Sequence, residues 1–271
     1  MAACRVTSLS IDSRFADQYY DGTAEFMIRL PSIMRNVSRI ALTSVELPQV
    51  AYVFSAKAGN TGFFLDMMGS RVERVIADGN YTPSQLATAI TVAINEGGID
   101  VSYNSITNRF VLSSAGPIVL TFASASGASA RTRYWGLGYW LGFREQAVFV
   151  GAGATVAAPQ APQVAPPAYA FVQVQYPDMA ENTLHRTETG SFVQALAKVV
   201  LRPSGSSSFY TIQYDDGANF VNKETVFPSA TAISQLRIRL VDAYGVLVDM
   251  GDIDWSMTLE VTEIVNALAR C

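Results

Sequence analysis

The stretch FMIRLPSIMRNVSRIALTSVELP, residues 26–48, decides the fold class. Apolar residues alternate from Phe26 to Leu30, and a second strand-like run extends from Val37 to Leu47. A period of two is typical of a β-strand that buries one face. Proline lacks the N–H donor of a sheet ladder, so Pro31 and Pro48 are each expected to end a strand.

Similar runs recur along most of the chain, separated by turn residues. The further predicted strands are Arg5–Ile11, Phe63–Leu65, Val72–Ile76, Ile99–Tyr103, Arg109–Ser113, Ile118–Phe122, Tyr169–Tyr176, Phe192–Leu201, Phe209–Tyr214, Thr225–Phe227, Ile233–Val241, Val246–Met250 and Trp255–Val265. Many short antiparallel strands must pack sheet on sheet to bury their inner faces. The predicted fold class is therefore mainly β, a jelly-roll-like antiparallel β-sandwich with an inserted small αβ module.

One helix is predicted, over about residues 83–95. Apolar side chains recur at helical spacing from Leu86 to Ile94. Thr82 and Gln85 have the spacing of a capping box, Pro83 suits the first helical position, and the glycines at 97–98 supply the stop.

The element order predicts an interrupted domain. Residues 1–58 and 169–271 would form the sandwich, and residues 59–150 would be the inserted module. Residues 151–168 are rich in Ala, Pro and Gly and carry no charge, which indicates an extended connector or an arm on a neighbour. The alternative is two β-rich domains in series, split at this tract.

The charge balance favours protein partners over nucleic acid. Lys and Arg number 19 against 23 Asp and Glu, a net charge of −4, which removes the attraction to a phosphate backbone. Charged residues make up only 15% of the chain, so much of its surface is expected to be neutral. No direct membrane span is expected, because the long uncharged stretch 146–177 contains helix-breaking prolines.

The residues that usually carry chemistry are scarce. His185 is the single histidine, in a polar segment expected to be a surface loop. Asp249, Asp252 and Asp254 could hold a calcium ion, but turn formation explains them better and no EF-hand spacing is present. We therefore predict no catalytic, cofactor-binding or metal-binding residue, no cofactor, and a protein that is not an enzyme. Cys4 and Cys271 are expected to be reduced, since two lone thiols form no disulfide framework.

An aromatic, glycine-rich segment leads to Phe143 and could be a short helix or a buried turn. Its side chains suit a core, but Tyr and Trp flanked by Arg also match the composition of protein–protein hot spots. The candidate interface residues, including prolines of the uncharged tract, are Tyr134, Trp135, Tyr139, Trp140, Phe143, Pro159, Pro162 and Pro166.

Several short segments, taken in order, resemble a known family. They are SLSIDSR (Ser8–Arg14), IALTSVELP (Ile40–Pro48), GNYTPSQL (Gly79–Leu86), LGF (Leu141–Phe143), LRIRLVDAYG (Leu236–Gly245) and WSMTLE (Trp255–Glu260). Their order is similar to that in the minor capsid proteins of nucleocytoplasmic large DNA viruses, particularly the algal-virus group. The tract 151–168 matches no motif of that family.

The resemblance implies a structural protein of the icosahedral virion capsid, made and assembled in the host cytoplasm. Its partners would be major capsid protein trimers and other minor capsid proteins, with possible self-association. A vertex (penton) protein forming a five-fold ring is the related alternative. A carbohydrate-binding sandwich of a viral spike or fibre, with Trp135, Trp140 and Trp255 as stacking platforms, is the alternative from another class.

Overall fold

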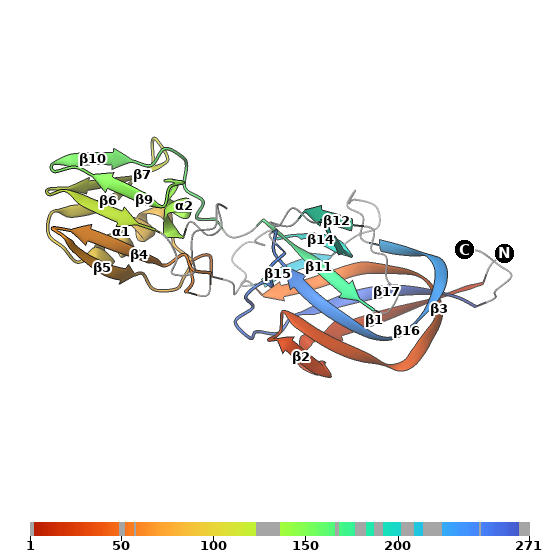
Figure 1. The fold of residues 1–271 in the computed structure, drawn as a ribbon. Coiled ribbons are helices and arrows are strands. Elements are labelled where there is room, and N and C mark those ends of the chain that lie inside the picture. Colours follow the sequence, from red (N-terminus) through yellow and green to blue (C-terminus); the bar gives the residue numbers. More distant parts are fainter. Residues whose placement is uncertain are drawn as a thin grey trace. The chain divides into compact units, whose positions relative to one another are not determined.

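The computed structural model describes residues 3–48, 52–56, 58–122, 136–165, 168–176, 183–186, 192–201, 209–213, 224–243 and 245–265. The chain divides into two units, one formed by Met1–Ala51 with Pro167–Cys271 and the other by Tyr52–Pro166. Antiparallel strands dominate both units, so the prediction of a mainly β fold is confirmed (Figure 1).

The first unit is built on one eight-stranded sheet that curls over its core (Figure 1). Its main path runs β1-β17-β3-β16-β11-β14, and β2 and β15 also pair with β3. The strands are β1 (Cys4–Asp12), β2 (Gln18–Asp21), β3 (Glu25–Pro48), β11 (Tyr169–Gln175), β14 (Ala197–Val200), β15 (Phe209–Gln213), β16 (Glu224–Val241) and β17 (Ser256–Ile264). A 3-10 turn, η1 (Ser13–Phe15), follows β1, and β12 (Thr183–Arg186) pairs with β13 (Phe192–Ala195).

The strands β3 and β16 are continuous where the sequence predicted breaks. β3 runs for 24 residues through Pro31, and β16 runs for 18 residues through Pro228. Their register shifts between Val226 and Gln235, so the prolines lie where the ladder is interrupted. A bulge leaves residues unpaired and bends the strand, which explains how both strands pass a proline. The prediction that Pro31 ends a strand is therefore wrong.

Two other strand predictions need correction. Residues 246–250 form a loop with one isolated bridge, between Val241 and Leu247. The predicted strand 192–201 is divided at Leu196 into β13 and β14, which pair with different strands. Leu196 and most of the apolar residues of the loop 246–250 pack against the core although their backbone is not in a strand. An apolar composition typical of a strand therefore does not require a strand at these positions.

Cys4 is disulfide-bonded, contrary to the predicted reduced thiol. The antiparallel pairing of β1 with β17 places Cys4 opposite Ile264, close in sequence to the only other cysteine of the chain. That cysteine, Cys271, lies outside the described residues. The spacing of two distant cysteines could not reveal this strand pairing.

The second unit has its own core between two small sheets and two helices. One sheet has the order β5-β4-β8-β9 and the other β10-β7-β6. The elements are β4 (Gly62–Met67), β5 (Ser70–Val75), α1 (Pro83–Ile94), β6 (Ile99–Asn104), β7 (Arg109–Ser114), β8 (Ile118–Thr121), α2 (Leu137–Leu141), β9 (Ala147–Val150) and β10 (Ala154–Ala157). Fully buried Phe54, Leu86, Phe110 and Leu120 belong to this core, and each such side chain contributes about 1.5–3 kcal/mol on burial.

The predicted helix is present as α1. The Thr82 side chain accepts a hydrogen bond from the Gln85 N–H, and the Gln85 side chain accepts one from the Thr82 N–H, so the capping box is confirmed. The helix ends at Ile94, before the glycines at 97–98, because Asn95 already adopts the left-handed conformation with a φ of 50°.

The uncharged tract is part of the second unit rather than a connector or arm over its described residues, 151–165. Within it, β10 pairs antiparallel with β7. Beyond β10, the N–H groups of Gln160 and Gln163 donate to the carbonyls of Gly142 and Trp140, at 3.0 and 2.9 Å. The Ala, Thr and Val residues of β10 can form a short edge strand. Four residues are too few for an alternating pattern to be recognised in the sequence.

Replacement of Gly142 by alanine is expected to destabilise the second unit. Gly142 has a φ of 90°, and an added Cβ would lie 2.2 Å from the Gln160 carbonyl oxygen. The combined strain and clash should cost about 2 kcal/mol or more, measured as a lower urea midpoint by tryptophan fluorescence. Gly116→Ala is the control, because a Cβ there meets nothing within 4 Å. Equal midpoints for the two variants would contradict the docking of residues 160–163 on α2.

Candidate protein interface

The aromatic residues predicted as an interface lie mainly in the core of the second unit. Tyr139 and Phe143 are 7% and 2% exposed. Trp140 is half-buried and packs edge-on against Phe54, with ring centroids 5.9 Å apart. The structure therefore favours the core interpretation for these three side chains.

Of the remaining predicted interface residues, two lie in the described part of the chain. Pro159 is exposed and Pro162 is half-buried. Tyr134, Trp135 and Pro166 lie outside the described residues.

In the acidic cluster, Asp249 forms a turn, as the sequence favoured. The Asp249 carboxylate accepts a hydrogen bond from the Gly251 N–H, and Asp254 accepts one from the Ser13 hydroxyl. Among the described residues, no three His, Cys, Asp or Glu side chains are grouped to hold a metal ion. His185 belongs to β12 rather than to the predicted loop.

None of the helices in the described part of the chain has both the length and the apolar character needed to cross a membrane.

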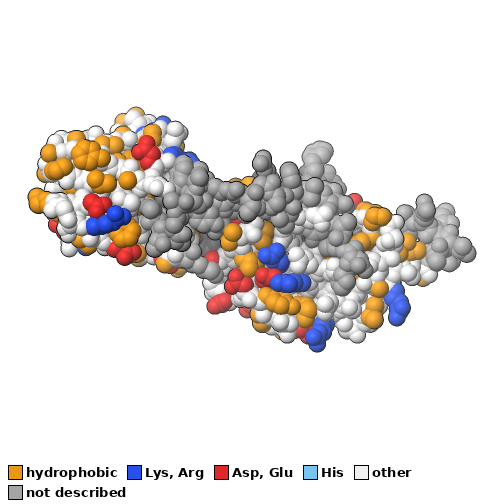
Figure 2. Space-filling view, viewed as in Figure 1, with side chains coloured by type: hydrophobic (Ala, Val, Ile, Leu, Met, Phe, Trp, Pro, Cys, Tyr) orange, Lys and Arg blue, Asp and Glu red, His pale blue; other side chains and the backbone are white. Residues whose placement is uncertain are grey.

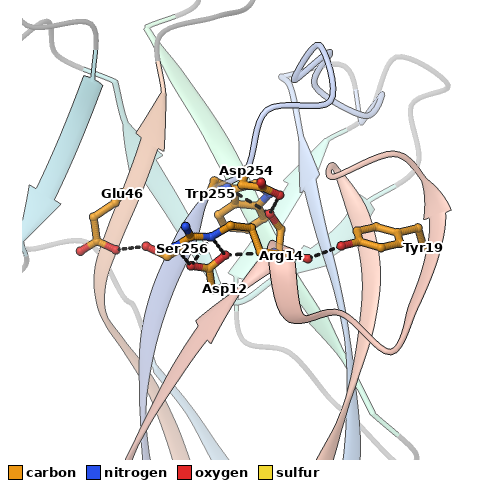
Figure 3. A network of polar contacts seen from close by, with 8 residues as sticks. Asp12, Arg14, Tyr19, Glu46, Asp254, Trp255 and Ser256 are labelled. Carbon is orange, nitrogen blue, oxygen red and sulfur yellow. Dashed lines mark hydrogen bonds and ion pairs between the residues drawn. The ribbon is translucent and has the colours of Figure 1, made fainter.

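A surface whose side chains are held by many polar contacts lies at the end of β1, in the first unit. We call this surface the η1 corner. It comprises residues 12–15, strand β2 and residues 251–255. Figure 3 shows the side chains of this corner converging from β1, β2 and the segment before β17. Its geometry is fixed by polar contacts, while several aromatic side chains point to solvent.

The Asp12–Arg14 pair closes the turn. Asp12 caps η1 by accepting a hydrogen bond from the Arg14 N–H at 2.9 Å. The same carboxylate accepts from Arg14 Nε at 3.0 Å and from Nη2 at 2.6 Å, a forked arrangement (Figure 3). The forked geometry adds direction to an otherwise weak surface ion pair.

Ser13 connects the turn to the 251–255 segment and to β2. It is fully buried, and its hydroxyl donates to Asp254 at 2.9 Å and accepts from the Trp255 N–H at 3.1 Å. Its own N–H donates to the Trp255 carbonyl, and its carbonyl accepts from the Tyr19 hydroxyl at 2.6 Å. All of the polar groups of Ser13 are therefore engaged.

Trp255 supports the corner from inside. Its ring is 3% exposed and packs edge-on against Phe26, with ring centroids 5.7 Å apart. The indole N–H donates to the Thr23 carbonyl at 2.7 Å, and the Thr23 hydroxyl donates to the Ile253 carbonyl. The corner is thereby attached to the core of the first unit.

The outer side of the corner presents aromatic rings beside arginines. Phe15 is 75% exposed, and Tyr19 and Tyr20 are 47% and 44% exposed. The Arg14 guanidinium lies 5.7 Å from the Phe15 ring centroid, and that of Arg237 lies 4.2 Å from the Tyr20 ring. Exposed Tyr, Phe and Arg on a rigid support are the composition and preorganisation of a protein–protein hot spot.

Sequence reasoning did not find this corner. Phe15 lies in a three-residue turn and Tyr19 in a four-residue strand, and neither has a periodic pattern. The available signal was Asp12-Ser-Arg14, an N-cap followed by a residue that can fold back on it.

Comparisons with known proteins show no family to which this chain belongs. No protein-family model matches the sequence, and no curated protein matches it. Among solved structures, the chain is similar to the mavirus penton protein at 9% identity and a TM-score of 0.44, over 95% of this chain and 99% of that one. A likeness this weak carries no conclusion about the function of this chain.

Ser13→Ala is expected to destabilise the first unit by about 1–3 kcal/mol, because the buried Trp255 N–H loses its acceptor and Asp254 loses its donor. Chemical denaturation would measure the change. Ser10→Ala, at an exposed position of β1, should change stability by less than about 0.5 kcal/mol. A Ser13 variant as stable as the Ser10 variant would show that the network does not hold the corner.

The Asp12–Arg14 pair should stabilise the fold only when the carboxylate is charged. The Arg14 hydrogen bond holds the pKa of Asp12 below its ordinary value, although burial opposes this. Such a contribution is present above the unfolded-state pKa and is lost as the pH falls through the folded-state pKa. Asp12→Asn should therefore lower the melting temperature at about pH 7 and leave it unchanged at about pH 2.

A mutant cycle with Arg14→Gln tests the same pair. The double variant should lose no more stability at neutral pH than either single variant. Additive losses would mean that the two side chains act separately.

Proposed function

We propose that this protein is a structural component of a virion shell, a minor capsid protein that bridges major capsid protein trimers and other minor capsid proteins. The η1 corner is the observation that carries the binding part of this proposal, because it presents rigid aromatic and arginine side chains to solvent. The corner contains the end of the segment Ser8–Arg14, the first of the ordered motifs that resemble capsid proteins.

The surface supports binding to proteins. On the face seen in Figure 2, acidic and basic side chains form small mixed groups, and patches of hydrophobic side chains lie between these groups in both units. Few charges must be desolvated when such a surface meets a partner. Each of the two units has its own apolar core, so each can present a fixed surface to a partner.

The carbohydrate-binding alternative receives no support from two of its three tryptophans. Trp255 is buried, and Trp140 packs in the core of the second unit, so neither ring is free to stack on a sugar. Trp135 lies outside the described residues. The vertex (penton) alternative differs in assembly and predicts a five-fold ring, which native mass spectrometry of the purified protein would detect.

Phe15→Ser is expected to weaken binding to purified major capsid protein trimers by about tenfold or more, because a central exposed aromatic side chain is a typical hot spot. Surface-immobilised trimers and biolayer interferometry would measure the affinity. Ile106→Ser is the control, since Ile106 is 94% exposed but belongs to the second unit. Equal binding by both variants would exclude the corner as the contact, and no binding by the wild type would refute the bridging role.

A further inference from the structure

Strand β1 is an unprotected edge of the large sheet. Within the described chain it pairs only with β17 and ends the strand order. It is nine residues long, and the six from Val6 to Ile11 carry no charge. The side chains of Val6, Ser8 and Ser10 are exposed, and no other described strand pairs with this edge.

The hydrogen-bonding direction of each β1 residue follows from the register. The Ser13 N–H donates to the Trp255 carbonyl, and the Val265 N–H donates to the Ala3 carbonyl, at 2.9 Å each. In an antiparallel pair the bonded residues alternate, so odd-numbered residues of β1 bond to β17. The N–H and C=O groups of Val6, Ser8 and Ser10 therefore point away from the sheet.

Three other edge strands among the described residues are protected. The Thr91 hydroxyl of α1 occupies both the N–H and the C=O of Val101 on the outer side of β6. Strand β5 carries Arg71, Glu73 and Arg74. Strand β14 has four residues and includes Lys198. Covering an edge, shortening it and placing charges on it are the usual ways to prevent pairing. Within the described part of the chain, β1 has none of these protections between Val6 and Ile11.

We propose that β1 pairs with the β1 strand of a second copy of this chain, antiparallel and about a two-fold axis at Ser8. A two-fold axis normal to the sheet sets even residues against even residues, so the outward groups of both strands meet. Val6 then lies opposite Ser10 of the second copy, and Arg5 lies opposite its Ile11, so no like charges face each other. Strand β14, the opposite edge of the sheet, has four residues and is too short to match nine.

This pairing adds backbone hydrogen bonds without disturbing the monomer. The groups that it uses are those that β17 leaves free, and both core faces continue across the new pair because odd residues stay on the inner side. The inference does not depend on the proposed capsid role. It concerns only the association of the chain with itself.

Charge substitutions at Ser8 test the pairing and its symmetry. Two Ser8 residues would face each other about 5.5 Å apart between Cα atoms, so Ser8→Lys and Ser8→Glu should each remain monomeric in sedimentation velocity while the wild type forms dimers. An equimolar mixture of the two variants should form dimers again. Ser102→Lys, at an exposed position of β6, is the control and should dimerise like the wild type.

Proline substitutions separate pairing from folding. Ser8→Pro removes a donor that points outward, so it should abolish dimers and leave the melting temperature within a few degrees of wild type. Thr7→Pro removes a donor used by β17 and should lower the melting temperature strongly. A monomeric wild type, dimers that persist in Ser8→Lys, or no recovery in the mixture would overturn the proposal.

Discussion

The pairing of β3 with β16 is the constraint on which the first unit depends. β3 receives β2, β15, β16 and β17 along its length, so its bend sets the position of four other strands. Arg39 spans the three central strands by contacting Glu224 of β16 and Glu260 of β17, at 2.6 and 2.8 Å. Burial acts to lower the pKa of Arg39, but these two carboxylates outweigh it and raise the pKa. Because the Arg39 guanidinium is partly exposed, its ion pairs with Glu224 and Glu260 contribute little to stability. Their main effect is to fix the register of the three strands.

The parts of the fold that could be predicted from the sequence are those fixed by local chemistry. The cap of α1 and the alternation in β7 or β17 depend on neighbouring residues, and each lies near its predicted position. The passage of β3 through Pro31 could not be predicted, because it requires a bulge against a partner strand about 200 residues away in sequence. For β10, four small residues become a strand only because β7 offers an edge.

In the candidate interface too, features set by neighbouring residues could be predicted from the sequence, and features set by tertiary contacts could not. Asp249 was correctly interpreted as a turn former, since its carboxylate accepts a hydrogen bond from the backbone N–H two residues ahead. Exposure is a tertiary property, and it separates Phe15 from Phe143, two phenylalanines that composition alone treats alike. The glycines around α2 explain the burial of Phe143, because they let the backbone approach Phe122 and Gln160 closely.

The free edge of β1 and the η1 corner are consecutive parts of one chain segment, and they offer different kinds of contact. Backbone groups of the edge accept any extended strand, so they supply affinity with little selectivity. The aromatic and arginine side chains of the corner supply selectivity, because their shape and position are fixed by Ser13 and Trp255. The pairing of β1 with β17 holds both in place. A partner that engaged both surfaces would therefore meet a preorganised site and would pay little conformational entropy on binding.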